Sequence, residues 1–117
     1  MSNQTDNPLK VLEGRQLSSV EFVHDYIQLH FEGATLSAMT LPRVCILDKT
    51  FESESLGYRD ALCERIGQRI SHALTIPENE IRIVFNDRST ISISLASKDY
   101  RTPEAAVFHN GDQIVVW

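Results

Sequence analysis

The feature that most constrains the fold is an alternation of apolar and polar residues that occurs in two similar stretches. The first copy, residues 14–39, contains the segment IQLHF, and the second copy, residues 67–96, contains IRIVF. Successive side chains of a strand point to opposite faces of a sheet, so this period of two predicts half-buried β-strands. Turn residues divide each copy into three runs. We therefore expect one three-stranded antiparallel meander in each copy.

The two copies align along most of their length. Gly14 aligns with Gly67 and Leu17 with Ile70, and a single inserted residue then brings IQLHF onto IRIVF. This agreement favours a duplication over a chance likeness between neighbouring meanders. Two copies are too few for a solenoid, which needs about three. Each meander has one apolar face that it cannot bury alone, so we expect the two to pack as a sandwich or a partial barrel.

The other segments predict a strand, a helix and a hairpin. Residues 42–47 form an apolar run typical of a buried strand, and the polar residues 48–55 are typical of a loop. Apolar residues then recur at helical spacing, at Tyr58, Ala61, Leu62 and Ile66. Gly67 can end that helix in the left-handed conformation. Near the C-terminus, Asn110-Gly111 predicts a hairpin turn.

These elements give an α+β fold that is mostly antiparallel β, with two pseudo-repeated three-stranded meanders, one intervening helix and a C-terminal hairpin. The chain has 117 residues, of which 42% are hydrophobic. That is enough for one domain to bury a core without a disulfide or a metal. Residues 1–8 are polar, so we expect a disordered lead-in there and a single domain over residues 9–117.

Charge and hydropathy exclude several partners. The formal net charge is −5 and the arginines form no cluster, so we expect no binding to nucleic acid. The few lysines leave no polybasic patch for a membrane surface. No apolar run approaches the roughly 18–20 residues of a membrane helix. The polar N-terminus does not fit a signal peptide, so we expect a cytoplasmic protein whose Cys45 and Cys63 stay reduced.

The order of several motifs is similar to that in a family of small bacterial proteins of unknown function. The motifs are DYIQLHF, LPRV, GYRDALCERIG, IRIVF and PEAAVF, and they cover nearly the whole chain after the lead-in. The resemblance implies a single domain from a bacterial cytoplasm. It implies no activity, so no functional residue follows from it.

Motifs for catalysis, metal binding and nucleotide binding do not occur in the sequence. The His and Cys residues include no close pair such as C-x-x-C or H-x-x-x-H, so we expect no metal site. Cys63 falls inside the predicted helix rather than at its N-terminus, where a thiolate is stabilised. No G-x-S-x-G, G-x-G-x-x-G or G-x-x-x-x-G-K-[ST] string is present, so we expect no cofactor.

Three exposed regions are candidate binding sites. Segment 99–104 is the most varied in its chemistry, and the other two regions lie at predicted hairpin ends. The candidate binding residues are His24, Asp25, Asp99, Tyr100, Arg101, Glu104 and His109. Each region also has a simpler interpretation, as a turn or as a connecting loop whose Arg101 pairs with a neighbouring acid.

Two classes of function stay open. Because no catalytic motif is found, we expect a non-enzymatic protein-binding module that pairs strand edges with a protein partner or with a second copy. An immunity- or antitoxin-like protein that neutralises a basic enzyme through its acidic charge is one version. The alternative is a small enzyme or small-ligand-binding protein with a site between the two copies, built from His24, His72 or His109.

Overall fold

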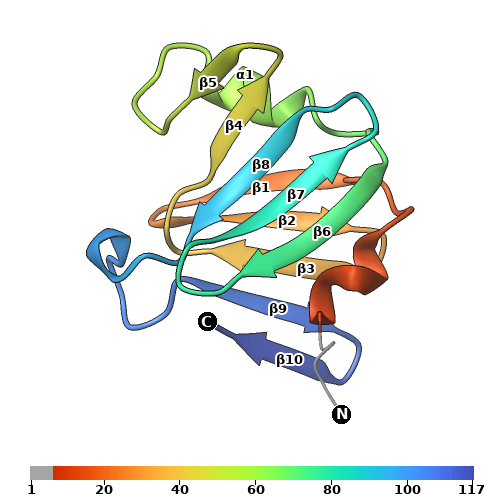
Figure 1. The fold of residues 1–117 in the computed structure, drawn as a ribbon, viewed down its shortest axis with the longest axis vertical. Helices are drawn as coiled ribbons and strands as arrows, with labels where there is room; N and C mark the ends of the chain where they lie inside the picture. Colours follow the sequence, from red (N-terminus) through yellow and green to blue (C-terminus); the bar gives the residue numbers. More distant parts are fainter. Residues whose placement is uncertain (1–6) are drawn as a thin grey trace.

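The structure is a computed structural model that describes residues 7–117, and its strands form two antiparallel five-stranded sheets (Figure 1). The first sheet contains β1 (Ser19–Val23), β2 (Tyr26–Phe31), β3 (Ala34–Ala38), β9 (Ala106–Asn110) and β10 (Gln113–Val116). The second contains β4 (Arg43–Ile46), β5 (Lys49–Phe51), β6 (Ile70–Ile76), β7 (Glu80–Phe85) and β8 (Thr90–Ser94). The helical elements are η1 (Pro8–Leu12), α1 (Tyr58–Cys63) and η2 (Ser97–Asp99). The predicted class, mostly antiparallel β with one α-helix between the strands, is confirmed for these residues.

Each sheet consists of one meander and one hairpin. The strand order is β1-β2-β3-β9-β10 in the first sheet and β5-β4-β8-β7-β6 in the second. The hairpin β4–β5 follows β3 in the chain but joins β8 in the other sheet, and β9–β10 follows β8 but joins β3. Each sheet is therefore completed by a hairpin from the other half of the chain.

The two meanders use the same strand register. Leu29 of β2 pairs with Leu36 of β3, and Ile83 of β7 pairs with Ile91 of β8. The sequence alignment matches Leu29 with Ile83 and Leu36 with Ile91. Each of these pairs joins the second and third strands of its own meander.

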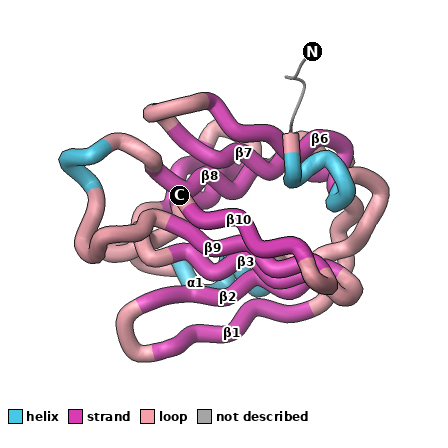
Figure 2. Tube along the Cα trace, turned by 90° about the horizontal axis from the view of Figure 1, so that it is seen from below, coloured by secondary structure: helices cyan, strands magenta, loops and turns pink. Residues whose placement is uncertain are grey.

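The inner faces of both sheets contribute to one core. Figure 2 shows the sheets as two layers, and one buried cluster takes side chains from both of them. The alternation predicted for the two copies is confirmed by side chains that are at most 4% exposed, at Ile27, Leu29, Phe31, Ile81, Ile83 and Phe85. Burial of each such side chain contributes roughly 1.5–3 kcal/mol, so this core is the main source of stability.

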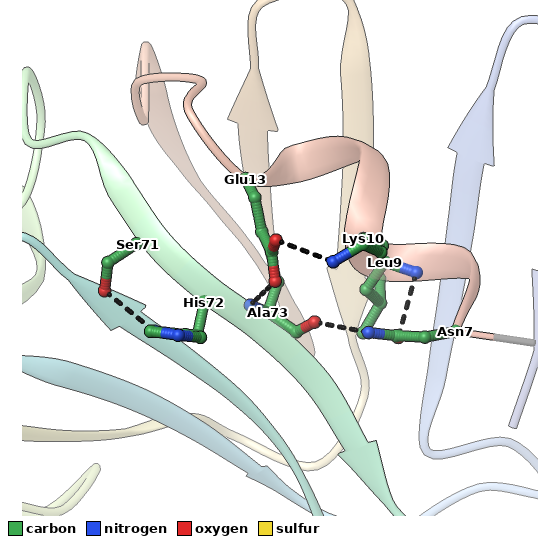
Figure 3. A network of polar contacts seen from close by, with 7 residues as sticks. All are labelled: Asn7, Leu9, Lys10, Glu13, Ser71, His72 and Ala73. Atoms are coloured by element: carbon green, nitrogen blue, oxygen red, sulfur yellow. Dashed lines mark hydrogen bonds and ion pairs between the residues drawn. The ribbon is translucent and has the colours of Figure 1, made fainter. Parts of the chain in front are cut away.

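The 3-10 turn η1 and the residues at its two ends cover the free edge of β6 at Ala73 (Figure 3). Asn7 Nδ2 donates to the Ala73 carbonyl oxygen at 2.7 Å, and the Ala73 N–H donates to Glu13 Oε2 at 3.3 Å. Lys10 Nζ lies 3.3 Å from Glu13 Oε1, and Leu9 anchors the turn with a fully buried side chain. The outward carbonyl and N–H of Ala73 are therefore both bonded to side chains of this segment.

The segment between the two meanders differs from its prediction at two points. Leu47 is not buried, as its apolar run suggests, but is 91% exposed at the turn between β4 and β5. Residues 48–55 are not all loop, because Lys49–Phe51 form β5. The cause is pairing: Thr50 returns antiparallel to Cys45, which gives the polar segment a strand neighbour.

The α-helix is shorter than its prediction. It ends at Cys63, and Ile66 lies beyond it with 42% of its surface exposed. The N–H groups of Arg65 and Ile66 bond to carbonyls three residues back, so the chain tightens into 3-10 turns after the helix. Gly67 does have a positive φ, of 90°, but it follows the helix end rather than forming it.

The two ends of the described chain bear on two further predictions. The C-terminal hairpin is confirmed as β9 and β10, but its turn consists of Gly111 and Asp112, and Asn110, predicted to lie in the turn, is the last residue of β9. Of the predicted lead-in, residues 1–6 lie outside the described residues, while Asn7 caps η1 and Pro8 begins it. In the described part of the chain, no helix has the length and apolar character needed to cross a membrane.

Candidate functional site

The predicted binding residues fall at three separate places. His24 and Asp25 form the turn between β1 and β2, where their side chains are 94% and 71% exposed. His109 is exposed on β9, which β3 separates from β2. The other four predicted residues belong to the connection between β8 and β9, residues 95–105. The structure therefore does not bring the predicted set together at one site.

The connection between β8 and β9 does place two of its predicted residues in a cleft. Tyr100 packs against the core, while Asp99 and Arg101 on either side of it are exposed. Asp99 Oδ2 accepts a hydrogen bond from Ser94 Oγ at 2.6 Å, which fixes η2 to the end of β8. Glu104 is exposed further along the connection. Asp99 and Arg101 both line the cleft, whereas Tyr100 and Glu104 do not.

This polar cleft has a volume of about 540 Å³ and lies over the outer face of the second sheet. Ser92 and Ser94 of β8 lie at its base, beside Glu80 of β7. Arg43 of β4 lines one side, and residues 96–101 contribute to the other. The alternation pattern predicts that both serines point away from the core, and this is confirmed by the burial of Ile91, Ile93 and Leu95, which alternate with them.

Each carboxylate of the cleft already has a partner within the chain. Glu80 Oε2 accepts from Arg82 Nε at 2.6 Å. Glu52 Oε2 lies 3.1 Å from Arg43 Nε. The third carboxylate, Asp99, is held by β8 as described above. The acids of the cleft are therefore engaged in positioning its basic side chains and its wall.

The strand β10 forms an open edge of the first sheet. Trp117 N–H donates to the Ala106 carbonyl at 2.9 Å, and hydrogen-bonded pairs alternate along an antiparallel ladder. The backbone groups of Val116 and Ile114 therefore point away from β9. Within residues 7–117 no side chain or loop bonds to them. Their side chains are 52% and 59% exposed, so the edge is also apolar.

The other three sheet edges differ from β10. The edge of β6 is covered by η1, and β5 is only 3 residues long and carries Lys49. The edge strand β1 contains Glu21 and contacts α1, where the Arg59 guanidinium lies 5.3 Å from the ring centre of Phe22. Charge, shortness and covering elements are the usual protections of strand edges. By comparison, β10 has no charged residue and no proline, and no other element among residues 7–117 bonds to its outer edge.

A buried polar cluster near α1 has a structural role. Arg65 is only 5% exposed, and its Nη1 donates to Asp87 Oδ2 at 2.7 Å and also to the Ser89 hydroxyl. Burial favours a higher pKa for Asp87, but hydrogen bonds from Ser89 and Arg65 outweigh it, so the pKa lies below its ordinary value. The cluster ties the segment after α1 to the turn between β7 and β8.

Tyr58 holds α1 beside the cleft. Its hydroxyl donates to the Pro42 carbonyl at 2.6 Å. Burial and the nearby Glu52 carboxylate both raise the pKa of Tyr58 above its ordinary value, so the phenol stays neutral and remains a donor. The contact fixes the chain just before β4, next to the arginine that lines the cleft.

The histidines do not share a site. His72 lies on β6 in the second sheet, where its Nδ1 is 3.3 Å from Ser71 Oγ (Figure 3), whereas His30 and His109 lie on the first sheet. Among residues 7–117, no group of three or more His, Cys, Asp and Glu side chains is placed to hold a metal ion.

No protein-family model, curated protein or solved structure matches the chain.

Proposed function

We propose that the protein is a non-enzymatic protein-binding module that accepts an extended segment of a partner as a sixth strand beside β10. The observation that carries this proposal is the row of outward backbone groups at Ile114 and Val116, next to side chains that are more than half exposed. Strand addition to such an edge gives affinity through main-chain hydrogen bonds and specificity through alternate side chains.

The charge around the edge supports a basic partner segment. Residues 102–117 contain Glu104 and Asp112 but no lysine or arginine, and the whole chain has a net charge of −5. Opposite charges on two partners raise the rate of association and suppress wrong partners. Neutralisation of a basic enzyme, as in immunity or antitoxin proteins, is one version of this function. A bacterial, cytoplasmic setting stays a prediction from the resemblance.

A site between the two halves of the chain has less support. The buried residues of the described chain are almost all apolar, and the exceptions are Ser37, Thr40, Arg65 and Ser89. An enzyme or a ligand pocket at that place needs convergent polar groups. The histidines offered for such a site lie on turns or exposed strand positions instead.

We also propose that the two halves are a duplication packed as a sandwich. Gly14 N–H donates to the Ile70 carbonyl and Gly67 N–H donates to the Leu17 carbonyl, both at 2.8 Å. These four residues are the counterparts matched by the sequence alignment, so the two bonds are reciprocal. An experimental structure in which residues 14–51 superpose on 67–115 by a twofold rotation tests this proposal. Loss of these reciprocal bonds there contradicts it.

The proposed binding mode is tested with proline at the edge. Ile114→Pro removes one outward N–H without breaking the β9–β10 ladder, because edge strands tolerate proline at such positions. The matched control is Thr50→Pro, since Thr50 has the same place in the β4–β5 hairpin. Each protein is immobilised and used to select binders from a random peptide library.

We expect wild type and Thr50→Pro to enrich peptides that alternate β-branched residues with lysine or arginine, and Ile114→Pro to lose them. If Ile114→Pro still enriches the same peptides as the wild type, the peptides do not bind at this edge and the proposed binding mode is wrong. Sedimentation equilibrium is run in parallel. A dimer of the wild type that Ile114→Pro abolishes shows that the partner is a second copy, which contradicts the basic segment proposed here.

A further inference from the structure

Ser92, which lines the polar cleft, has an arginine as its neighbour in each adjacent strand, and of these two arginines Arg43 also lines the cleft whereas Arg82 does not. Ser92 of β8 pairs with Arg43 of β4 on one side and with Arg82 of β7 on the other. Residues directly opposite each other in adjacent strands have Cβ atoms about 4.5–5.5 Å apart on the same face. Both arginines therefore flank the serine on the outer face of the sheet.

Both arginines keep hydrogen-bonding capacity. Each uses its Nε for a carboxylate, Glu52 for Arg43 and Glu80 for Arg82. Within the described chain, their Nη groups donate to no other residue. A guanidinium held in place through Nε presents a planar set of donors that matches the oxygens of a phosphate or a carboxylate.

The opposite wall adds two more cations. Lys98 and Arg101 line the cleft, and neither forms an ion pair with any residue of the described chain. They lie in residues 95–105, whereas the corresponding connection between β3 and β4 is only residues 39–42. The longer connection is thus the segment that builds this wall, and loops held on a rigid sheet are common sites of binding.

We propose that this cleft binds a small oxyanion with two negative charges, such as a phosphate monoester or a dicarboxylate. The three carboxylates of the cleft are bonded within the chain, and the Ser92 hydroxyl donates to Glu80 Oε2 at 3.3 Å. The unused donors that line the cleft are therefore the Nη groups of Arg43 together with Lys98 and Arg101. These groups match an anion and disfavour a cation. The site lies on the second sheet and is independent of the proposed binding to β10 on the first.

The test is a titration of the isotope-labelled full chain, followed by backbone amide shifts in NMR. Inorganic phosphate, succinate and the singly charged acetate are added at constant ionic strength set with sodium chloride. The variants are Arg43→Gln and the double variant Lys98→Ala, Arg101→Ala, all at residues that line the cleft. The matched control is Arg88→Gln, since Arg88 is exposed in the turn between β7 and β8 and does not line the cleft.

We expect saturable shifts at Ser92, Ser94 and residues 96–101 with phosphate or succinate, and much weaker shifts with acetate. Loss of one charged partner lowers affinity about tenfold or more. Arg88→Gln therefore keeps the wild-type affinity while the cleft variants lose it. Saturation by phosphate alone assigns a phosphoryl ligand, and saturation by succinate alone assigns a dicarboxylate. Linear shifts with every anion, or equal shifts in all variants, overturn the proposal.

Discussion

The free edges of β6 and β10 both border a five-stranded antiparallel sheet, yet only β6 has outward backbone groups that a neighbouring segment bonds, at Ala73. At β6, Asn7 and Glu13 bond to the carbonyl and the N–H of Ala73. At β10, no described residue bonds to the outward groups of Ile114 and Val116. Exposed strand edges promote unwanted pairing, and proteins usually protect them. The contrast between the two edges is the observation behind the proposed binding of a partner at β10.

We expect the largest loss of stability when η1 is detached from β6. Leu9→Ala removes a fully buried side chain from η1. We expect a loss of about 2–5 kcal/mol in the free energy of unfolding, because the lost burial adds to a cavity. Val11→Ala is the control, since Val11 lies on the same turn and is 43% exposed. Urea denaturation compares the two, and a loss as large for Val11→Ala as for Leu9→Ala contradicts the anchoring role.

A smaller loss of stability is expected when only the hydrogen bond between Glu13 and the Ala73 N–H is removed. Glu13→Ala takes away the acceptor for the Ala73 N–H, and we expect a loss of about 1 kcal/mol in the free energy of unfolding. Burial works to raise the pKa of Glu13, but hydrogen bonds from Ala73 and Lys10 outweigh it, so the pKa lies below the ordinary 4.5.

Because the pKa of Glu13 is lowered in the folded state, its contribution to stability should depend on pH. The folded state favours the Glu13 carboxylate, so its contribution is complete above pH 4.5 and is lost as pH falls through the folded-state pKa. The stability difference between wild type and Glu13→Ala should therefore shrink in acid. Denaturation curves measured across this range test it, and a difference that stays constant or grows in acid contradicts the bonding at Ala73.

Substitutions in the turns of the β4–β5 and β9–β10 hairpins should change stability by a similar amount. Leu47 and Gly111 occupy the same turn position, with φ of 57° and 60°, a region that side chains with a Cβ disfavour. We expect Leu47→Gly to raise stability by about 1 kcal/mol and Gly111→Ala to lower it by about the same amount. Thermal unfolding measures both. If Leu47→Gly lowers stability instead, the exposed Leu47 side chain makes contacts that stabilise the β4–β5 hairpin.

The smallest effect on stability is expected at the open edge itself. Ile114→Lys places a charge on a side chain that is already 59% exposed, so we expect less than about 0.5 kcal/mol of change. The same variant should lose the basic peptides selected by the wild type, through repulsion between like charges. A large loss of stability shows instead that Ile114 supports the fold rather than binding.

The meanders could be predicted from the sequence because their pattern is local. Alternation at IQLHF and IRIVF fixes which side chains face the core, and Asn110-Gly111 fixes the last hairpin. The crossing of hairpins between sheets could not be predicted, because it depends on pairs far apart in the chain, such as Val44 with Ile91. The strand β5 escaped prediction for the same reason, since its polar residues gain a strand neighbour only in the folded chain.

The candidate sites could be predicted only in part. Asp99 and Arg101 were identifiable as an exposed, chemically varied segment, and they do line the cleft. Arg43 and Ser92 come together through the β4–β8 pairing, which leaves no local signal. The open edge of β10 also depends on topology, because the sequence does not show which strand ends a sheet.

Hydrogen exchange of individual backbone amides tests the difference between the two edges most directly. In the isolated protein we predict slow exchange for the Ala73 amide, which donates to Glu13, and fast exchange for the Ile114 and Val116 amides. A selected peptide should then slow exchange at Ile114 and Val116 and leave Ala73 unchanged. Slow exchange at Ile114 and Val116 in the isolated protein, at every protein concentration, contradicts an open edge at β10.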